Sequence, residues 1–396
     1  MSTLKGYNHR TVVILLLMAT LSVCSFAQES RGFKFNNLSV SPFVNLEYAY
    51  DSNVYYTKEA AGDSILTVNP GVDLTYKGND WGLTGNGWFA YDKYLDIDTL
   101  NATRYGESFE VYKETANGFR LVLGQKYLKS GQNDSLADGG RGLWRSRDEL
   151  SFNSALSYQV SEKTSLTLTG VYSDLNYAKD PVKYYDLYGW SEWSLGLEGA
   201  YKITEKSNLL LNGGYQNYTS DGAKGISSGS TGYSLMAGIG SAATKKITYR
   251  ILTGASWFQY AEGDQLVGWT YSLDSSWVIN KKLVATIAGS SYFQPSEQEQ
   301  NQATQVYALS TGLSYRPMGK LTTRFDISYR REENQFAVSS GGMNTEDRYS
   351  IRARADYQLM RYATVYLGAE YQDQLSDEDK YSFDRYRGTM GLSFRY

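Results

Sequence analysis

The chain has 396 residues and a formal net charge of −3, so its charge gives no reason to expect a nucleic-acid partner. It contains one histidine and one cysteine, which excludes a disulfide framework within the chain. The 36 tyrosines, 38 glycines and 8 tryptophans stand against only 5 prolines. Tyrosine and tryptophan are typical of membrane interfaces, where an apolar ring and a polar tip both find partners.

Residues 1–27 are predicted to be a cleaved signal peptide. A positively charged start precedes the apolar run Thr11–Val23 and the A-x-A-like site Ser25-Phe26-Ala27. The run is too short for a spanning helix, which needs about 20 residues. Leu21-Ser22-Val23-Cys24 also approximates a lipobox, although valine is a poor residue before the acceptor cysteine. Cleavage after Ala27 removes both His9 and Cys24 from the mature chain.

Apolar and polar residues alternate from residue 39 to the end of the chain. Val44, Leu46, Tyr48 and Tyr50, for example, share one parity, as on a β-strand whose two faces meet different environments. We predict an all-β fold, a transmembrane antiparallel β-barrel of about eighteen strands over residues 39–396, each of about 9–11 residues. A soluble sandwich or propeller is the alternative, but its strands average about 5–6 residues. Residues 28–38 are predicted to be a short periplasmic extension.

The predicted connections alternate in length, with eight short turns and nine long loops. Thr115–Gly118, Ile279–Lys282 and Pro317–Lys320 are short, and both termini are expected on their periplasmic side. The long loops include residues 51–63, 130–145, 175–187, 219–231 and 332–346. Tyr158–Leu166 nearly repeats as Tyr201–Leu209, which indicates duplication of a hairpin unit.

The last residues predict how the barrel closes. Tyr386, Met390, Leu392, Phe394 and Tyr396 share one parity, and a free edge strand of this kind would aggregate. Pairing with the first strand removes the edge. The ending resembles the C-terminal signal strand of bacterial outer-membrane barrels. That resemblance implies a place in the outer membrane, with its lipid, lipopolysaccharide and the barrel assembly machinery as partners.

Catalytic groups are scarce in the mature chain. Without histidine or cysteine it cannot use His-based general bases or His/Cys metal sites, so we predict neither an enzyme nor a cofactor or metal. Asp274 and Asp326 are interpreted as lumenal ion-pairing carboxylates rather than a glycosidase pair. The acidic run Ser376–Asp379 is interpreted as a solvated loop, since it lacks the ligand spacing of an EF-hand.

The polar faces of the strands are predicted to line the lumen. On the last five strands the lumenal arginines are Arg316, Arg324, Arg330, Arg348, Arg352, Arg354, Arg385, Arg387 and Arg395. Only Asp326, Asp356 and Glu370 share these faces, so this arc is predicted to be basic and the opposite arc, on the first eight strands, mildly acidic. Unpaired arginines would favour anions in transit. Alternatively, the arginines pair with acids across the wall or contact lipopolysaccharide near the rim.

Inward-facing aromatic residues form a second set of candidates, Trp88, Tyr112, Tyr292 and Tyr366. Aromatic faces suit stacking on sugar rings in a channel. Packing against an infolded loop is the alternative role.

The segment Phe43–Tyr55, with its Tyr50-Asp51-Ser52-Asn53-Val54 core, resembles the opening of a family of outer-membrane β-barrel porins associated with exopolysaccharide synthesis and export. The stretch Ser64–Tyr76, which contains Pro70-Gly71-Val72, is similar too. The resemblance implies an eighteen-strand porin that passes polysaccharide, with polysaccharide export proteins as partners, because the chain lacks the periplasmic helical repeat domain of some exporters.

Together these features predict a passive porin-like channel of the outer membrane for exopolysaccharide or for anionic or sugar-like solutes. The alternative is a non-conducting barrel whose extracellular loops act as a surface adhesin or scaffold.

Overall fold

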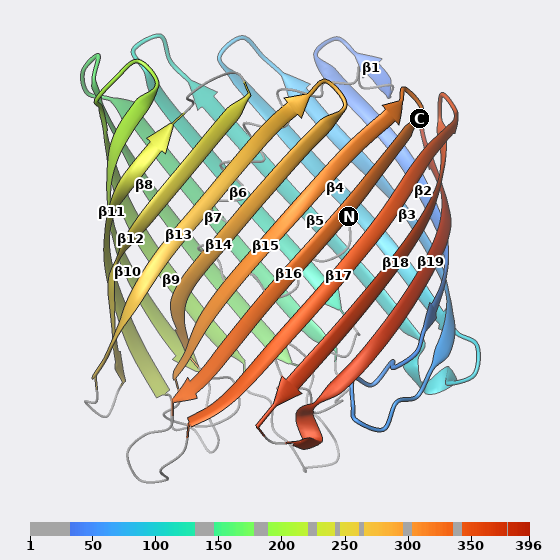
Figure 1. Cartoon of the computed structure of the whole chain (residues 1–396). Coiled ribbons are helices and arrows are strands. Elements are labelled where there is room, and N and C mark those ends of the chain that lie inside the picture. Colours follow the sequence, from blue (N-terminus) through green and yellow to red (C-terminus); the bar gives the residue numbers. More distant parts are fainter. Residues whose placement is uncertain are drawn as a thin grey trace.

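The computed structural model describes residues 32–130, 146–177, 189–220, 228–241, 246–260, 265–295, 303–335, 343–377 and 379–396. Their strands form one sheet in which β2 to β19 each pair antiparallel with their neighbours in the chain. Strand β19 then pairs back onto β2, so eighteen strands close into a barrel (Figure 1). The predicted closed barrel of eighteen strands is confirmed. The predicted signal peptide, residues 1–27, lies outside the described residues.

The elements follow one another without a break in topology. In chain order they are β1 (Phe33–Phe35), β2 (Leu38–Asp51), β3 (Asp63–Lys77), β4 (Trp81–Tyr94), the 3-10 helix η1 (Asp98–Leu100), β5 (Ala102–Glu114), β6 (Phe119–Ser130), β7 (Arg147–Gln159), β8 (Thr164–Tyr177), β9 (Trp190–Lys202), β10 (Ser207–Ser220), β11 (Ser228–Ser241), β12 (Ile247–Tyr260), β13 (Gln265–Asn280), β14 (Leu283–Pro295), β15 (Ala303–Met318), β16 (Leu321–Gln335), β17 (Met343–Met360), β18 (Ala363–Ser376), the 3-10 helix η3 (Asp379–Tyr381) and β19 (Phe383–Arg395). The described residues hold no helix long and apolar enough to span a membrane.

The barrel strands are longer than predicted. They run from 12 residues in β6 to 18 in β17, against the expected 9–11. The difference arises because alternation and pairing continue into segments expected to be loop: β16 extends to Gln335 and β17 begins at Met343, inside the predicted loop 332–346.

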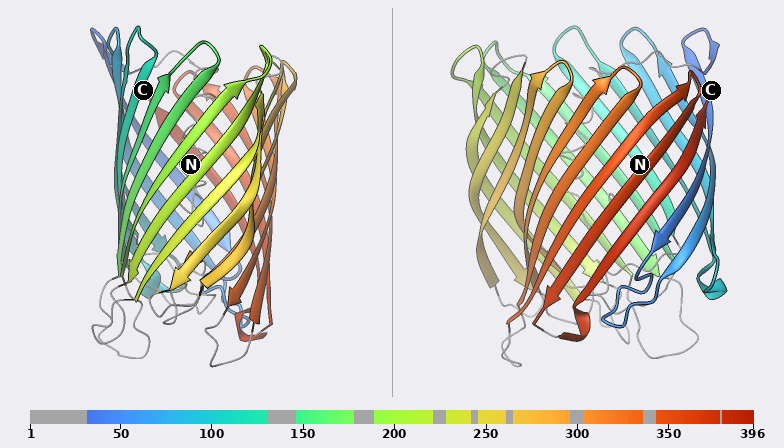
Figure 2. Two further views of the ribbon diagram at one scale, coloured as in Figure 1. Left: turned by 90° about the vertical axis from the view of Figure 1, so that its left-hand side faces the viewer. Right: turned by 45° about the vertical axis from the view of Figure 1, so that its right-hand side comes forward.

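The connections gather at two ends of the barrel (Figures 1 and 2). The eight connections at one end, hereafter the turn end, are short, like residues 281–282 and 361–362. The nine at the other end, hereafter the loop end, include the longest, residues 52–62, 131–146 and 178–189. The near-repeated segments form matching turns, since Val160 N donates to Thr164 O at 2.9 Å and Ile203 N to Ser207 O at 2.9 Å.

The outer face of the barrel is apolar, with aromatic rings toward both ends. Leu197 and Leu211, on neighbouring strands, are more than half exposed. Near the loop end, outward rings meet in pairs, such as Tyr371 and Tyr386 with centroids 4.7 Å apart and Trp193 and Tyr215 at 4.9 Å. An apolar band between aromatic girdles is the exterior of a transmembrane barrel.

The segment after Tyr50 fastens the first strand to the last. Arg385 of β19 donates to both carboxylate oxygens of Asp51, at 2.8 Å and 2.5 Å, and both side chains are at most 5% exposed. The Tyr56 ring lies over the Arg385 guanidinium, 4.5 Å away. Bidentate geometry makes this a strong charge-assisted contact, and the register places it across the closing seam.

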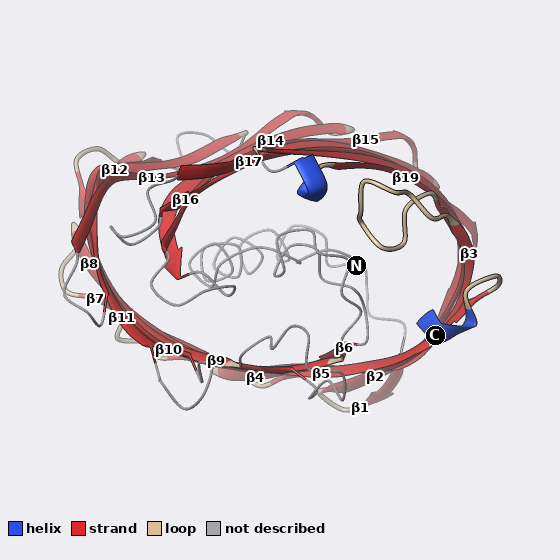
Figure 3. Cartoon of the chain, turned by 90° about the horizontal axis from the view of Figure 1, so that it is seen from below, coloured by secondary structure: helices blue, strands red, loops and turns tan. Residues whose placement is uncertain are grey.

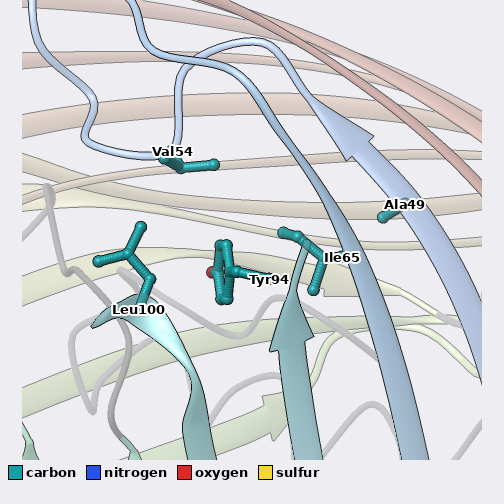
Figure 4. Packing of buried hydrophobic residues seen from close by; sticks show 5 residues of the cluster. All are labelled: Ala49, Val54, Ile65, Tyr94 and Leu100. Carbon is teal, nitrogen blue, oxygen red and sulfur yellow. The ribbon is translucent and has the colours of Figure 1, made fainter. Parts of the chain in front are cut away.

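Asn53 and Val54 complete this fastening. The Asn53 amide donates to the carbonyl oxygens of Thr57 and Asp384, at 2.7 Å and 3.1 Å. Val54 is 2% exposed and belongs to a cluster made with residues of β2, β3, β4 and η1 on the inner side of the wall. Figure 4 shows this cluster, Ala49, Val54, Ile65, Tyr94 and Leu100. The loop after β2 therefore folds back onto the wall instead of extending away from it.

Two glycines mark a tight bend of the wall between β11 and β12. Seen from the loop end, the barrel is oval, and these strands lie at one narrow end (Figure 3). A methyl group on Gly238 would overlap the carbonyl oxygen of Ile251, and one on Gly254 would overlap that of Leu235. Glycine in a strand interior is typical of such a bend. The inward side chains of Leu210, Met236 and Leu252 pack together beside it.

Candidate functional site

The lumen has two chemically different walls. The charged wall comprises the inward faces of β16–β19 and β2–β5, where arginines and carboxylates alternate with small polar residues. The neutral wall comprises the inward faces of β8–β14. Its few charged residues, within the described strands, are Glu192, Glu198, Lys202, Arg250 and Asp274. The neutral wall is instead rich in hydroxyl and amide groups, including Thr167, Thr169, Asn212, Gln216, Ser234, Ser256, Ser272, Thr286 and Ser290.

Toward the loop end, the arginines of the charged wall are buried. Arg330 pairs with Glu332 and donates to the Tyr292 hydroxyl at 3.0 Å. Directly opposite it on β17, Arg348 donates to the Gln374 side-chain oxygen at 2.9 Å and 2.5 Å. Like charges placed opposite one another on neighbouring strands are destabilising, so the bonds to Glu332 and Gln374 hold this arrangement together.

Nearer the turn end, the arginines are more exposed but still paired. Arg324 and Arg354 face each other in register and share Asp356, at 3.3 Å and 2.9 Å. Arg352 pairs with Glu370 at 2.7 Å. With 55% of its side chain exposed, Arg324 is the most accessible of the three. Two carboxylates therefore offset most of the charge of these three guanidinium groups within the wall.

The remaining predicted arginines are placed at the seam and at the turn end. Arg387 pairs with Glu47 of β2 at 3.4 Å, and Arg395 pairs with Asp73 of β3 at 2.5 Å. Arg316 is exposed on β15 near the turn end. The prediction that the acidic arc lies opposite the basic arc is wrong for β2 and β3, because barrel closure brings their carboxylates beside the arginines of β19.

Aromatic rings of the charged wall lie against glycines of the neighbouring strand. A side chain at Gly391 would overlap the Tyr366 ring and one at Gly71 the Phe43 ring, while one at Gly106 would come within 3.1 Å of the Trp88 ring. Large rings commonly cover glycines in this way in designed sheets. The wall is smooth here because each ring occupies the space that a neighbouring side chain would take.

The four predicted aromatic candidates differ in how open they are to the lumen. Tyr366 is 5% exposed, and its hydroxyl donates to Glu47 at 2.8 Å. The Arg354 guanidinium lies over the Tyr366 ring, 4.0 Å from its centroid. Tyr292 is also 5% exposed and is bonded to Arg330. Trp88 is only partly buried, between glycines of β3 and β5. Tyr112, whose ring lies against Gly82, is partly buried too, so Trp88 and Tyr112 are the candidates whose rings are more open to the lumen.

Sequence reasoning missed several acids of the charged wall. Glu332 and Glu346 lie inward on β16 and β17, where the sequence predicted a loop, and Asp51 was placed at the start of another loop. The signal was present: Glu332 has the parity of Arg330, and Glu346 that of Arg348. Had the alternation been followed to the ends of these strands, it would have identified the carboxylates that balance the arginines.

The described residues contain no cluster of three or more His, Cys, Asp or Glu side chains suited to a metal ion. The charges of the neutral wall are fewer than its hydroxyl and amide groups, and Arg250 pairs there with Glu198 of β9. The lumen can therefore offer hydrogen bonds to a solute along one wall. Along the other wall, arginines and carboxylates pair with one another.

No family model and no curated protein matches the chain. Among solved structures, it is similar to the FrpB iron transporter of Neisseria meningitidis (11% identity, TM-score 0.48), covering 90% of this chain and 65% of that one. It is also similar to the siderophore receptor PirA of Acinetobacter baumannii (8%, TM-score 0.47, 92% and 81% covered) and to OccAB3 of the same organism (10%, TM-score 0.45, 91% and 100% covered). Similarities this low do not assign the fold. The assignment of a closed barrel rests instead on the strand pairing observed in this chain.

Proposed function

We propose that this chain is a porin-like channel of the bacterial outer membrane that passes uncharged, hydroxyl-rich solutes of the saccharide type. An eighteen-strand barrel encloses a lumen wide enough for an aqueous channel. The apolar exterior between aromatic girdles supports a membrane location, and short turns face the periplasm in barrels of this class.

The observation that carries the proposal is the pairing of the lumenal arginines. Arg352 and Arg354 are bonded to Glu370 and Asp356, so they offer little net field to a passing anion. The neutral wall presents hydroxyl and amide groups, which exchange hydrogen bonds with sugars as readily as with water. Anionic solutes are therefore less favoured than the sequence alone suggested. An exopolysaccharide strand belongs to the proposed solute class, and the export role implied by the family resemblance stays a prediction.

The test is single-channel recording of the whole chain in planar bilayers, with maltohexaose added as the probe. We expect stable conductance that the oligosaccharide blocks reversibly, because it occupies the hydroxyl-lined lumen. Trp88→Ala should weaken the block several-fold if the open ring stacks on sugar, whereas Tyr366→Phe, a change at a covered ring, should not. Absence of any conductance would overturn the channel and favour a surface scaffold. Conductance without block would overturn the saccharide assignment alone.

A further inference from the structure

The turn end carries a run of basic residues that the channel does not use. Six consecutive turns, from β7–β8 to β17–β18, each contain Lys or Arg: Lys163, Lys206, Lys246, Lys281, Lys282, Lys320 and Arg361. These seven residues, hereafter the basic arc, are all exposed. The two acids within the same turns are Glu162 and Glu205. The arc therefore has a clear positive excess.

The rest of the molecule does not share this charge. The remaining two turns at this end, residues 78–80 and 115–118, contain no basic residue. At the loop end, connection 95–101 contains Asp96 and Asp98 and no basic residue, and Lys58 in connection 52–62 is balanced by Glu59. The basic arc therefore covers six of the eight turns around one mouth, and the two turns without basic residues are neighbours.

Much of the charge in the arc is not neutralised by the protein. Within the described part of the chain, Lys163, Lys206, Lys281 and Lys320 form no ion pair. The Lys282 ammonium donates to the Pro317 carbonyl at 2.8 Å, which keeps its charge at the mouth. In the lumen, by contrast, the arginines are matched by carboxylates.

From this placement we infer that the basic arc is the docking surface for an acidic face of a periplasmic protein. Clustered, unpaired charge of one sign steers association with a partner of the opposite sign. A polyanion in transit would need cations continuing into the lumen, but there the arginines are paired. The unpaired positive charge is therefore confined to the mouth of the barrel, where a periplasmic protein can bind it.

The arc also fits a protein better than lipid headgroups. Except for Lys246, the basic tips follow an outward aromatic ring of the turn-end girdle by a few residues, as Lys163 follows Tyr158 and Lys206 follows Tyr201. Between ring and tip, Val160 and Ile203 are at least half exposed on the outward parity. The apolar groups therefore meet the bilayer, whereas the ammonium groups lie past it, toward the periplasm.

The experiment is site-specific photocrosslinking in cells, with a photoreactive residue at Asn280, next to Lys281 and Lys282. The control carries the same residue at Asn117, in a turn of the same end outside the arc. We expect one protein adduct from position 280, identified by mass spectrometry as an acidic periplasmic protein, and at least five-fold less adduct from position 117.

Charge dependence then decides the inference. Replacing Lys163, Lys206, Lys281, Lys282 and Lys320 by Gln should lower the adduct at least five-fold, whereas Arg at the same positions should retain it. Heat-modifiable migration on gels verifies that both variants are folded. No protein adduct, or an adduct retained by the Gln variant, would overturn the inference. So would lipid adducts alone, matched by purified barrels in phosphatidylethanolamine–phosphatidylglycerol vesicles. The readout does not depend on conductance, so the channel and the docking surface can fail separately.

Discussion

The charged wall and the neutral wall contribute in different ways to closing and shaping the barrel. In the charged wall, carboxylates and guanidinium groups bond neighbouring strands to one another, most tightly where Asp51 meets Arg385. In the neutral wall, the strands bend sharply at Gly238 and Gly254, and short hydroxyl side chains line the surface. The charged wall therefore holds the barrel closed, and the neutral wall sets its curvature and offers hydrogen bonds to a solute.

The largest expected effect comes from breaking the closing seam. Asp51→Ala leaves the Arg385 guanidinium buried without its carboxylate, and removal of one partner of a buried ion pair costs about 3–5 kcal/mol. We expect a marked fall in the midpoint of thermal unfolding, followed by circular dichroism and heat-modifiable gel migration.

The matched control for the seam is Lys58→Ala. Lys58 pairs with Asp379 where the two side chains are 59% and 78% exposed, and such surface pairs contribute about 0–1 kcal/mol. If Asp51→Ala unfolds no earlier than Lys58→Ala, the seam does not hold the barrel closed.

A smaller effect is expected at the bend of the neutral wall. Gly254→Ala brings a methyl group onto the Leu235 carbonyl, and overpacking of this kind costs about 1–3 kcal/mol. Gly213→Ala on β10 is the control, since a methyl group there meets no atom within 4 Å. Thermal unfolding should separate the two variants. Equal stability would show that the wall relaxes at the bend without cost.

The sequence predicts the barrel well because the relevant signal is local. A side-chain period of two identifies the outward face of each strand, and the outward parity ending at Tyr396 predicts closure. The balance of charge is not local. Which carboxylate meets Arg387 depends on the register across the seam, which places Glu47 within reach only after eighteen strands have closed. The Tyr50–Val54 core that carries the family resemblance likewise proves to fasten that seam.

The smallest effect is expected on ion selectivity, and it tests whether the charged wall is neutral to a solute. Because Arg324, Arg352 and Arg354 share their charge with Asp356 and Glu370, the unaltered pore should be only weakly selective. Replacing all three arginines by Ser exposes those carboxylates to the lumen and should shift the reversal potential in a KCl gradient modestly toward cations. The variant should also unfold at a lower temperature, since Asp356 and Glu370 both lose their arginine partners. A strongly anion-selective unaltered pore that loses this preference in the variant would mean that the arginines act on permeating ions directly, and that the pairing seen in the wall gives way when an anion enters.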